Sequence, residues 1–198
     1  MMKSIDFFEK QFQRQTSQED FSLNPFEEAV LPHLFGEVLD LGCGLGNLAI
    51  AAARKGCGVT ALDASRTAVH HVSRLAQRLG LRLNAAQVDL SQFAIDREFE
   101  SIVAIGLLMF LPMDKARALL AEIQRHTQPG GVAAINVLIE GTSFMEMFEP
   151  GHYYLFGKNE LSDQFAGWRI LLSRHDEFPA PGTTLKKFHT LVARKPAA

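Results

Sequence analysis

The sequence predicts an α/β fold in which a parallel β-sheet is covered by helices on both faces. Short, almost wholly apolar runs alternate along the chain with amphipathic helical patterns, and this alternation is typical of βαβ units. A turn with three glycines directly follows the first apolar run, at a position where such sheets bind ligands. At 198 residues, the chain is long enough for one domain with a substantial core.

Five apolar runs are predicted to be the parallel strands. In chain order they are Glu37–Leu41, Val59–Leu62, Arg82–Val88, Ser101–Ile105 and Val132–Ile139. Three helical patterns lie between them: Asn47–Lys55, a segment from Ser65 to Gly80, and a segment from Asp114 to a stop at Pro129-Gly130-Gly131. Serine is a favoured N-cap and glycine a favoured C-terminal stop, so the boundaries of the second helix are the best defined.

The last part of the chain departs from this rhythm. Trp168–Ser173 and Lys186–Ala193 both have strand character, and a loop with proline and glycine, Phe178 to Thr183, lies between them. This pattern predicts a closing β-hairpin. The sequence has no internal repeat and no linker, so we expect a single domain over residues 1–198.

Helical patterns also precede the first strand. Ile5–Gln15 places Ile5, Phe8 and Phe12 on one helical face, and Pro25 begins another short helix. We expect residues 1–35 to form a helical lid over the C-terminal end of the first strand.

Composition narrows the class of protein further. Twenty basic and 22 acidic residues give a net charge of −2, so the chain has no basic field for nucleic acid or an anionic membrane. Only Cys43 and Cys57 occur, which favours a reducing, cytoplasmic location over a disulfide framework. The longest apolar stretch, Ile102 to Met113, is too short to span a bilayer, and the seven histidines form no metal-type cluster. We expect a cytoplasmic monomer or weak homodimer without a metal.

The glycine-rich turn is the first candidate site. Gly42, Gly44 and Gly46 let the backbone approach a ligand closely and adopt conformations that side chains forbid. A dinucleotide-binding turn, G-x-G-x-x-G, would need its third glycine at position 47, which is Asn47 here. Asp40, just before the turn, would repel a pyrophosphate, so the turn favours a ligand that carries positive charge.

Two further acids end the next two strands. Asp63 is placed to accept hydrogen bonds from a ribose diol, and Asp89 to accept one from an adenine amino group. Together with Asp40, they fit an adenosine with a cationic tail, which favours S-adenosylmethionine over NAD. Simpler interpretations stay open: each of these two acids could be only a helix N-cap, and Cys43 is a small turn residue rather than a nucleophile.

The sequence Asp40-Leu41-Gly42-Cys43-Gly44-Leu45-Gly46 resembles the first motif of the class I S-adenosylmethionine-dependent methyltransferases, an acid followed by G-x-G-x-G. The segment from Leu107 to Thr142 is similar to the tellurite-resistance methyltransferases of the TehB type. They have a Leu-Met-Phe-Leu run and a Pro-Gly-Gly turn in this arrangement. The C-terminal part also resembles that family, so the similarity covers about residues 36 to 196.

The resemblance implies a Rossmann-like, seven-stranded, mostly parallel sheet with an antiparallel C-terminal strand. It also implies S-adenosylmethionine as the cofactor. Asp40 and the three glycines would contact its methionine part, Asp63 its ribose, and Asp89 its adenine. The full set of expected cofactor-binding residues is Asp40, Gly42, Cys43, Gly44, Gly46, Asp63, Ala64, Asp89, Leu90, Ile105 and Gly106.

The implied activity is methyl transfer to a small-molecule acceptor, either a metalloid oxyanion (tellurite or selenite) or another soft nucleophile. In the family, a histidine-arginine pair and a loop arginine serve the substrate. Here His175 matches the histidine, and it is the expected catalytic residue, but Asp176 and Thr183 stand at the places of the two arginines. His152 and Tyr153 are the expected substrate-binding residues, because insertions after the fifth strand often carry that role.

Two other functions stay open. An NAD-dependent oxidoreductase is disfavoured by Asn47 and Asp40, and a methyltransferase-like module could bind the cofactor without catalysis. Methylation of nucleic acid is disfavoured, because the chain is nearly neutral and lacks an N/D-P-P-Y run.

Overall fold

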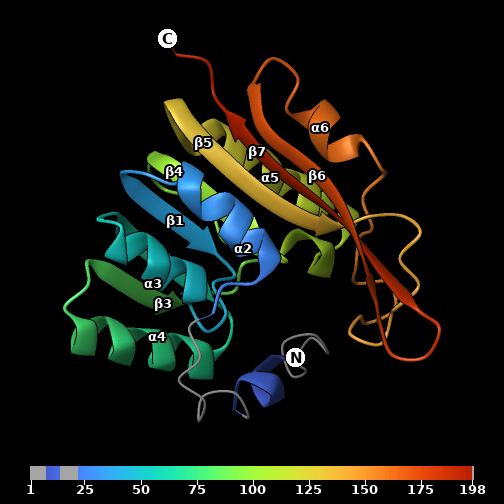
Figure 1. The fold of residues 1–198 in the computed structure, drawn as a ribbon, viewed down its shortest axis with the longest axis horizontal. Helices are drawn as coiled ribbons and strands as arrows, with labels where there is room; N and C mark the ends of the chain where they lie inside the picture. The colour runs from blue at the N-terminus through green and yellow to red at the C-terminus, as the bar shows by residue number, and fades with distance from the viewer. Residues whose placement is uncertain (1–7, 14–21, 198) are drawn as a thin grey trace.

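The computed structural model describes residues 8–13 and 22–197, which are built around one seven-stranded sheet (Figure 1). Its strands are β1 (Glu37–Leu41), β2 (Gly58–Asp63), β3 (Leu83–Gln87), β4 (Phe99–Ile105), β5 (Thr127–Leu138), β6 (Arg169–Pro179) and β7 (Leu185–Arg194). Their order across the sheet is β3-β2-β1-β4-β5-β7-β6. Strands β1 to β5 pair in parallel, whereas β7 is antiparallel to both β5 and β6. The predicted mostly parallel sheet with an antiparallel C-terminal strand is confirmed.

Helices cover both faces of this sheet. They are α2 (Pro25–Val30), α3 (Asn47–Arg54), α4 (Arg66–Leu79), α5 (Met113–His126) and α6 (Glu160–Gln164), with 3₁₀ turns η1 (Leu31–His33) and η2 (Leu108–Phe110). Figure 1 shows α2 and α3 in front of the sheet and α5 behind it. Because side chains alternate along a strand, Leu39 packs in a cluster with Leu120 of α5, and Val38 in another with Ala52 of α3.

The second predicted helix has the expected boundaries. The Ser65 hydroxyl accepts a hydrogen bond from the Ala68 N–H at 3.0 Å, and Gly80 ends α4 in the left-handed conformation, with φ +62°. Pro25 begins α2, as predicted, and the preceding Asn24 caps it together with Glu27.

The Pro129-Gly130-Gly131 segment was expected to end the third helix, and this prediction is wrong. Helix α5 ends at His126, where the Thr127 hydroxyl donates to the Ile123 carbonyl at 2.7 Å. The three residues lie inside β5, at a shift in register against β4. Glycine is needed in this bulge because a Cβ at Gly131 would lie 2.7 Å from the Glu100 carbonyl oxygen.

The closing hairpin is present, but its first strand is longer than predicted. Strand β6 continues to Pro179, so Phe178 is in a strand and not in the loop. As an edge strand paired only with β7, it carries exposed polar residues such as Arg169 and Glu177 among its apolar ones, which hides its length in the sequence. Among the described residues, no helix is long and apolar enough to cross a membrane, and no group of His, Cys, Asp and Glu side chains is arranged to hold a metal ion.

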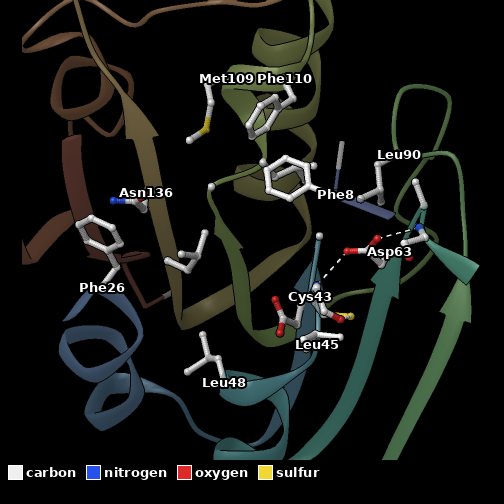
Figure 2. Close-up of a pocket in the computed structure, with 18 of the residues that line it drawn as sticks. Phe8, Phe26, Cys43, Leu45, Leu48, Asp63, Leu90, Met109, Phe110 and Asn136 are labelled. Carbon is white, nitrogen blue, oxygen red and sulfur yellow. Dashed lines mark hydrogen bonds between the residues drawn. The ribbon is translucent and has the colours of Figure 1, made fainter. Parts of the chain in front are cut away.

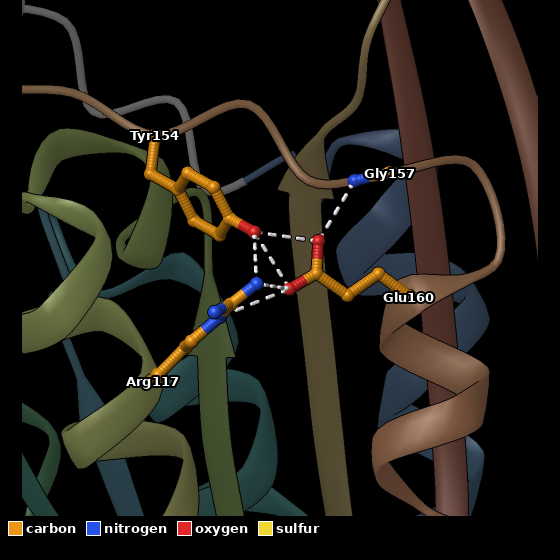
Figure 3. A network of polar contacts seen from close by, with 4 residues as sticks. All are labelled: Arg117, Tyr154, Gly157 and Glu160. Atoms are coloured by element: carbon orange, nitrogen blue, oxygen red, sulfur yellow. Dashed lines mark hydrogen bonds and ion pairs between the residues drawn. The ribbon is translucent and has the colours of Figure 1, made fainter.

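A polar network ties the segment after β5 to helix α5 (Figure 3). The Tyr154 hydroxyl lies 2.6 Å from both carboxylate oxygens of Glu160, and the Gly157 N–H donates to Glu160 Oε2 at 2.9 Å. Arg117 of α5 completes it with an ion pair to Glu160 Oε1 at 2.8 Å. The Glu160 side chain is only 17% exposed, so this one carboxylate satisfies several groups that water reaches poorly.

We expect Glu160→Ala to lower the free energy of unfolding by about 1–3 kcal/mol, because it leaves the Tyr154 hydroxyl and the Gly157 N–H without their acceptor. Urea denaturation measures this loss. Glu177→Ala is the matched control: its carboxylate is 59% exposed in an ion pair with Lys187, and its removal should cost less than about 1 kcal/mol. Equal losses in the two variants would contradict the role given to the network.

Candidate cofactor and substrate site

A cavity of about 490 Å³ lies at the carboxyl ends of the central parallel strands, where the strand order reverses between β1 and β4 (Figure 2). All of the residues predicted to bind the cofactor line it. They are Asp40, Gly42, Cys43, Gly44, Gly46, Asp63, Ala64, Asp89, Leu90, Ile105 and Gly106. The structure therefore brings this predicted set together around a single space, and their binding role remains a prediction.

The glycine turn takes a conformation that favours glycine at each of its three positions. Gly42, Gly44 and Gly46 have φ values of +75°, +52° and +77°. A Cβ at Gly46 would lie 2.6 Å from a methyl group of Val72 on α4, so the turn also lets two helices approach each other. The turn leads directly into the N-terminus of α3, for which Gly46 is the N-cap.

Asp63 holds the glycine turn in place. One carboxylate oxygen accepts from the Gly44 N–H at 2.8 Å and the other from the Ser65 N–H at 2.8 Å (Figure 2). Burial raises the pKa of Asp63, and the hydrogen bonds from Ser65, Gly44 and Ala64 oppose that rise. The N-cap of α4 is Ser65 itself, and each oxygen of Asp63 keeps a lone pair that can accept from a ligand hydroxyl.

Asp40 is buried in strand β1 and lines the cavity, and its carboxylate accepts no hydrogen bond from the other residues that the structure describes. Burial, followed by the negative charges of Glu27 and Asp63, raises the pKa of Asp40 to about 8. Glu27 of α2 also lines the cavity, and burial raises its pKa too. Three acids therefore converge where a positive charge would relieve their mutual repulsion.

Sequence reasoning missed Glu27 as a site residue. Its carboxylate accepts from the Asn24 N–H at 2.8 Å, which is the capping-box pattern at the start of α2. The same pattern could be found in the sequence, but only the packing of α2 against the strand ends brings this acid toward Asp40.

Asp89 differs from the other two predicted acids. It is exposed, and its Oδ1 accepts from the Ser91 N–H at 3.0 Å and the Ser91 hydroxyl at 2.7 Å. The hydrogen bonds from Ser91 lower the pKa of Asp89. The interpretation of Asp89 as a helix N-cap is wrong, because a turn and no helix follows it, and its contacts with Ser91 are local to that turn. Asp89 also lines the cavity.

Another part of the cavity lining is mostly apolar, and we call it the acceptor wall. It is formed by Phe8, Phe12, Phe26, Met109, Phe110, Asn136, Leu138, Met147, Lys186 and Phe188. Figure 2 shows Phe26 and Asn136 on one side, Met109 and Phe110 above, Asp63 on the other side, and Phe8 between Phe110 and Asp63 in this view. The sequence alone pointed to the phenylalanines of the N-terminal segments and to Lys186, a cation that either attracts an anion or faces solvent on its strand. The remaining wall residues come from strands and turns far apart in the chain.

The short helix of residues 8–13 covers part of this cavity. Phe8 packs edge-to-face on Phe110, with ring centroids 5.2 Å apart, and Phe12 lies next to Gly44. The Glu9 carboxylate accepts hydrogen bonds from the hydroxyls of Ser65 and Thr67 at the start of α4. Residues 1–7 and 14–21 of the expected lid lie outside the described residues.

The residues expected to act on the substrate lie away from the cavity lining. His175 Nε2 is 3.0 Å from the Lys158 carbonyl, and its ring stacks on His189 at 4.2 Å. His152 Nδ1 lies 3.4 Å from the Pro150 carbonyl, and Tyr153 packs on Phe148. The catalytic role of His175 and the substrate roles of His152 and Tyr153 stay predictions.

The fold and the position of the cavity are those of a class I S-adenosylmethionine-dependent methyltransferase. Residues 1–178 match the family described as "Tellurite resistance protein TehB". The chain belongs to this family, so the resemblance seen in its motifs is confirmed.

Two individual relatives extend beyond this chain, and one of them carries the family's name. Hemagglutinin 1 of Eikenella corrodens is 29% identical over 205 residues, which cover 98% of this chain and 64% of that protein. A probable S-adenosyl-L-methionine-dependent methyltransferase TehB of Haemophilus influenzae (strain 10810) is 27% identical over 169 residues, 80% of this chain and 57% of that protein. This chain therefore spans about three fifths of the length of these curated relatives.

A solved structure agrees with the fold. The crystal structure of TehB from Haemophilus influenzae superposes with a TM-score of 0.77 at 21% identity, over 97% of this chain and 67% of that one. None of these three proteins is described as an NAD-dependent enzyme.

We expect the affinity for S-adenosylmethionine to rise with pH between about 6 and 7.5, by up to about tenfold per unit. The physical reason is that Asp40, with a pKa of about 8, is mostly protonated in the free protein and must lose that proton to face a cation. Isothermal titration calorimetry in buffers of different ionisation enthalpy measures both the affinity and the proton released.

Asp40→Asn tests the assignment of that proton. The pH dependence should be flatter in this variant, and binding should be weaker at pH 7.5. Without ligand, the variant should be more thermostable than the wild type at pH 8, because the raised pKa makes the wild-type protein lose stability as pH rises from about 4 toward 8. A variant that keeps the full pH dependence would assign the proton to another group.

Proposed function

We propose that this chain transfers the methyl group of S-adenosylmethionine to a small, soft nucleophile that is already anionic at neutral pH. The observation that carries this proposal is the chemistry of the acceptor wall. Among the described residues of this wall the only ionisable side chain is Lys186. The other ionisable groups of the lining (Glu27, Asp40, Cys43, Asp63 and Asp89) lie outside the wall, and we assign the acids to the cofactor, so the wall itself offers no general base. An alcohol or a neutral amine would need such a base, whereas a thiolate or a chalcogen oxyanion does not.

The acid half of the cavity fits the cofactor. The glycine turn presents backbone close to the ligand, Asp63 can accept from the ribose hydroxyls, and the pair of Asp40 and Glu27 suits the positive charge of the methionine part. Bound there, the cofactor supplies an activated methyl group on a sulfonium.

The apolar half fits the transfer step. In an in-line displacement, the acceptor must meet the methyl carbon opposite the departing sulfur, and alignment of this kind can contribute up to about 7–11 kcal/mol. Charge disperses as the neutral thioether leaves, so a dry wall favours the reaction. The rings of Phe8, Phe110 and Phe26 provide such a wall, and we infer that residues 8–13 act as a lid that keeps water out.

The family description names tellurite, and selenite and thiolates belong to the same soft, anionic class of acceptors. We propose that the protein acts in the cytoplasm on such small molecules, as a monomer or weak homodimer. The free thiols of Cys43 and Cys57 support a reducing compartment. A module that binds the cofactor without catalysis is the second candidate, favoured by the positions of His175, His152 and Tyr153 away from the cavity.

Incubation with S-adenosylmethionine and separate acceptors tests the proposal. Selenite, tellurite and small thiols should each be compared with alcohols and amines, and the S-adenosylhomocysteine released should be measured. We expect release with soft anions and none above background with alcohols or amines. Cofactor binding without turnover on any acceptor would instead support the non-catalytic module.

Asp63→Ala should weaken binding of S-adenosylmethionine by about 1–3 kcal/mol, because charge-assisted hydrogen bonds to the ribose are lost. Calorimetric titration measures the change. Asp63→Asn, which keeps an acceptor for the Gly44 N–H, separates the charge from the support of the turn. Asp96→Ala is the matched control, since Asp96 is exposed and does not line the cavity. Unchanged binding in folded Asp63 variants would count against the assigned pocket.

A further inference from the structure

Lys186 is the one cation among the described residues that line the cavity, and it stands in the acceptor wall. It is half-buried on β7, and its Nζ lies 4.5 Å from the centroid of the Phe144 ring. No ion pair joins it to a carboxylate of the described residues. A cation held against an aromatic face and open to a cavity is placed to receive an anion from that cavity.

The neighbouring cations of the hairpin are already paired. Lys187 forms an ion pair with Glu177 at 2.8 Å, and Arg174 forms one with Asp176 at 2.7 Å. The Arg174 guanidinium also donates to the Pro25 carbonyl at 3.0 Å. Neither Lys187 nor Arg174 lines the cavity. The acceptor wall therefore offers about one unit of positive charge.

The surroundings of Lys186 are apolar and aromatic. The ring of Phe26 packs against that of Phe188, with centroids 4.6 Å apart, and Met147 and Met109 add polarizable sulfur to the lining. The one amide in the wall, Asn136, already donates to the Thr190 hydroxyl at 2.9 Å. A small, strongly hydrated oxyanion would find few donors here to replace its water. A molecule with an apolar body would bury that body against the rings.

We propose that the methyl acceptor is a small apolar thiol that carries one further anionic group, and that this group pairs with Lys186. The inference rests on the proposed function and narrows its substrate class. The thiol loses its proton to solvent, and the thiolate sulfur forms a bond to the methyl carbon. The bond from that carbon to the sulfonium sulfur breaks, and its electron pair stays on the departing sulfur, which leaves as the neutral thioether of S-adenosylhomocysteine.

Two aromatic thiols that differ in one charge test this assignment. With the wild-type protein and S-adenosylmethionine, kcat/KM for 4-mercaptobenzoate should exceed that for 4-methylbenzenethiol by at least about tenfold. Lys186→Met should remove this preference, mainly through the KM of the anionic thiol, while 4-methylbenzenethiol changes by less than about twofold. Lys186→Arg should retain most of the preference. Lys187→Met is the matched control and should behave as the wild type, because Lys187 is paired with Glu177 outside the cavity.

Three results would overturn the inference. They are an unchanged preference in Lys186→Met, a loss of S-adenosylmethionine affinity in that variant with the preference intact, or wild-type turnover with selenite or tellurite only. If no acceptor is turned over although the cofactor binds, the proposed function fails. The charge preference is then measured as binding of 4-(methylthio)benzoate against 4-(methylthio)toluene in the presence of S-adenosylhomocysteine. Equal binding of the two would overturn the role of Lys186.

Discussion

The site depends on one carboxylate that joins two strand ends. Asp63, at the end of β2, accepts hydrogen bonds from the Gly44 N–H in the turn after β1 and from the Ser65 N–H at the start of α4. Through these two bonds it fixes the glycine turn against the helix that follows β2. Because the turn is held from the side, its backbone stays close to the cavity. The short helix of residues 8–13 then meets a fixed surface, where Glu9 contacts the same helix start.

The cavity is divided by charge, and the division follows the topology of the sheet. The acids come from the ends of β1 and β2 and from α2. The methionines, Lys186, Phe110 and Phe188 come from η2, β7 and the segment after β5, whereas Phe26 comes from α2 and Phe8 and Phe12 from residues 8–13. A cationic cofactor and an anionic acceptor would thus be drawn to opposite halves of one space. Their reacting atoms would meet where the halves join, and the protein would have to supply little beyond orientation and exclusion of water.

Sequence patterns predicted the sheet and the set of residues that lines the acid half of the cavity, because both depend on local chemistry. Strands β1 and β2 are mostly apolar, and Asp40 and Asp63 lie at their carboxyl ends, so spacing alone places these two acids together. No comparable sequence pattern marks the residues of the acceptor wall. Its residues lie on elements that meet only after the hairpin returns beside β5. The Gly131 bulge was wrongly predicted as a helix stop for a related reason. Glycine is needed there because the Glu100 carbonyl of another strand lies close, and the local sequence does not show that contact.

The folded hairpin shows what Asp176 and Thr183 do at the two positions where the family has arginines. At position 176 the family has an arginine and this chain has an aspartate, so one positive charge is missing. The Asp176 carboxylate also forms an ion pair with Arg174. Thr183 leaves the loop without its second arginine, and the neighbouring Thr184 hydroxyl donates to the Pro181 carbonyl and stabilises the turn. These changes remove positive charge beside the cavity and leave Lys186 without a competing cation in the described lining. A site built to bind a divalent oxyanion would gain from the opposite changes, which is consistent with the proposal of an acceptor with a single charge and an apolar body.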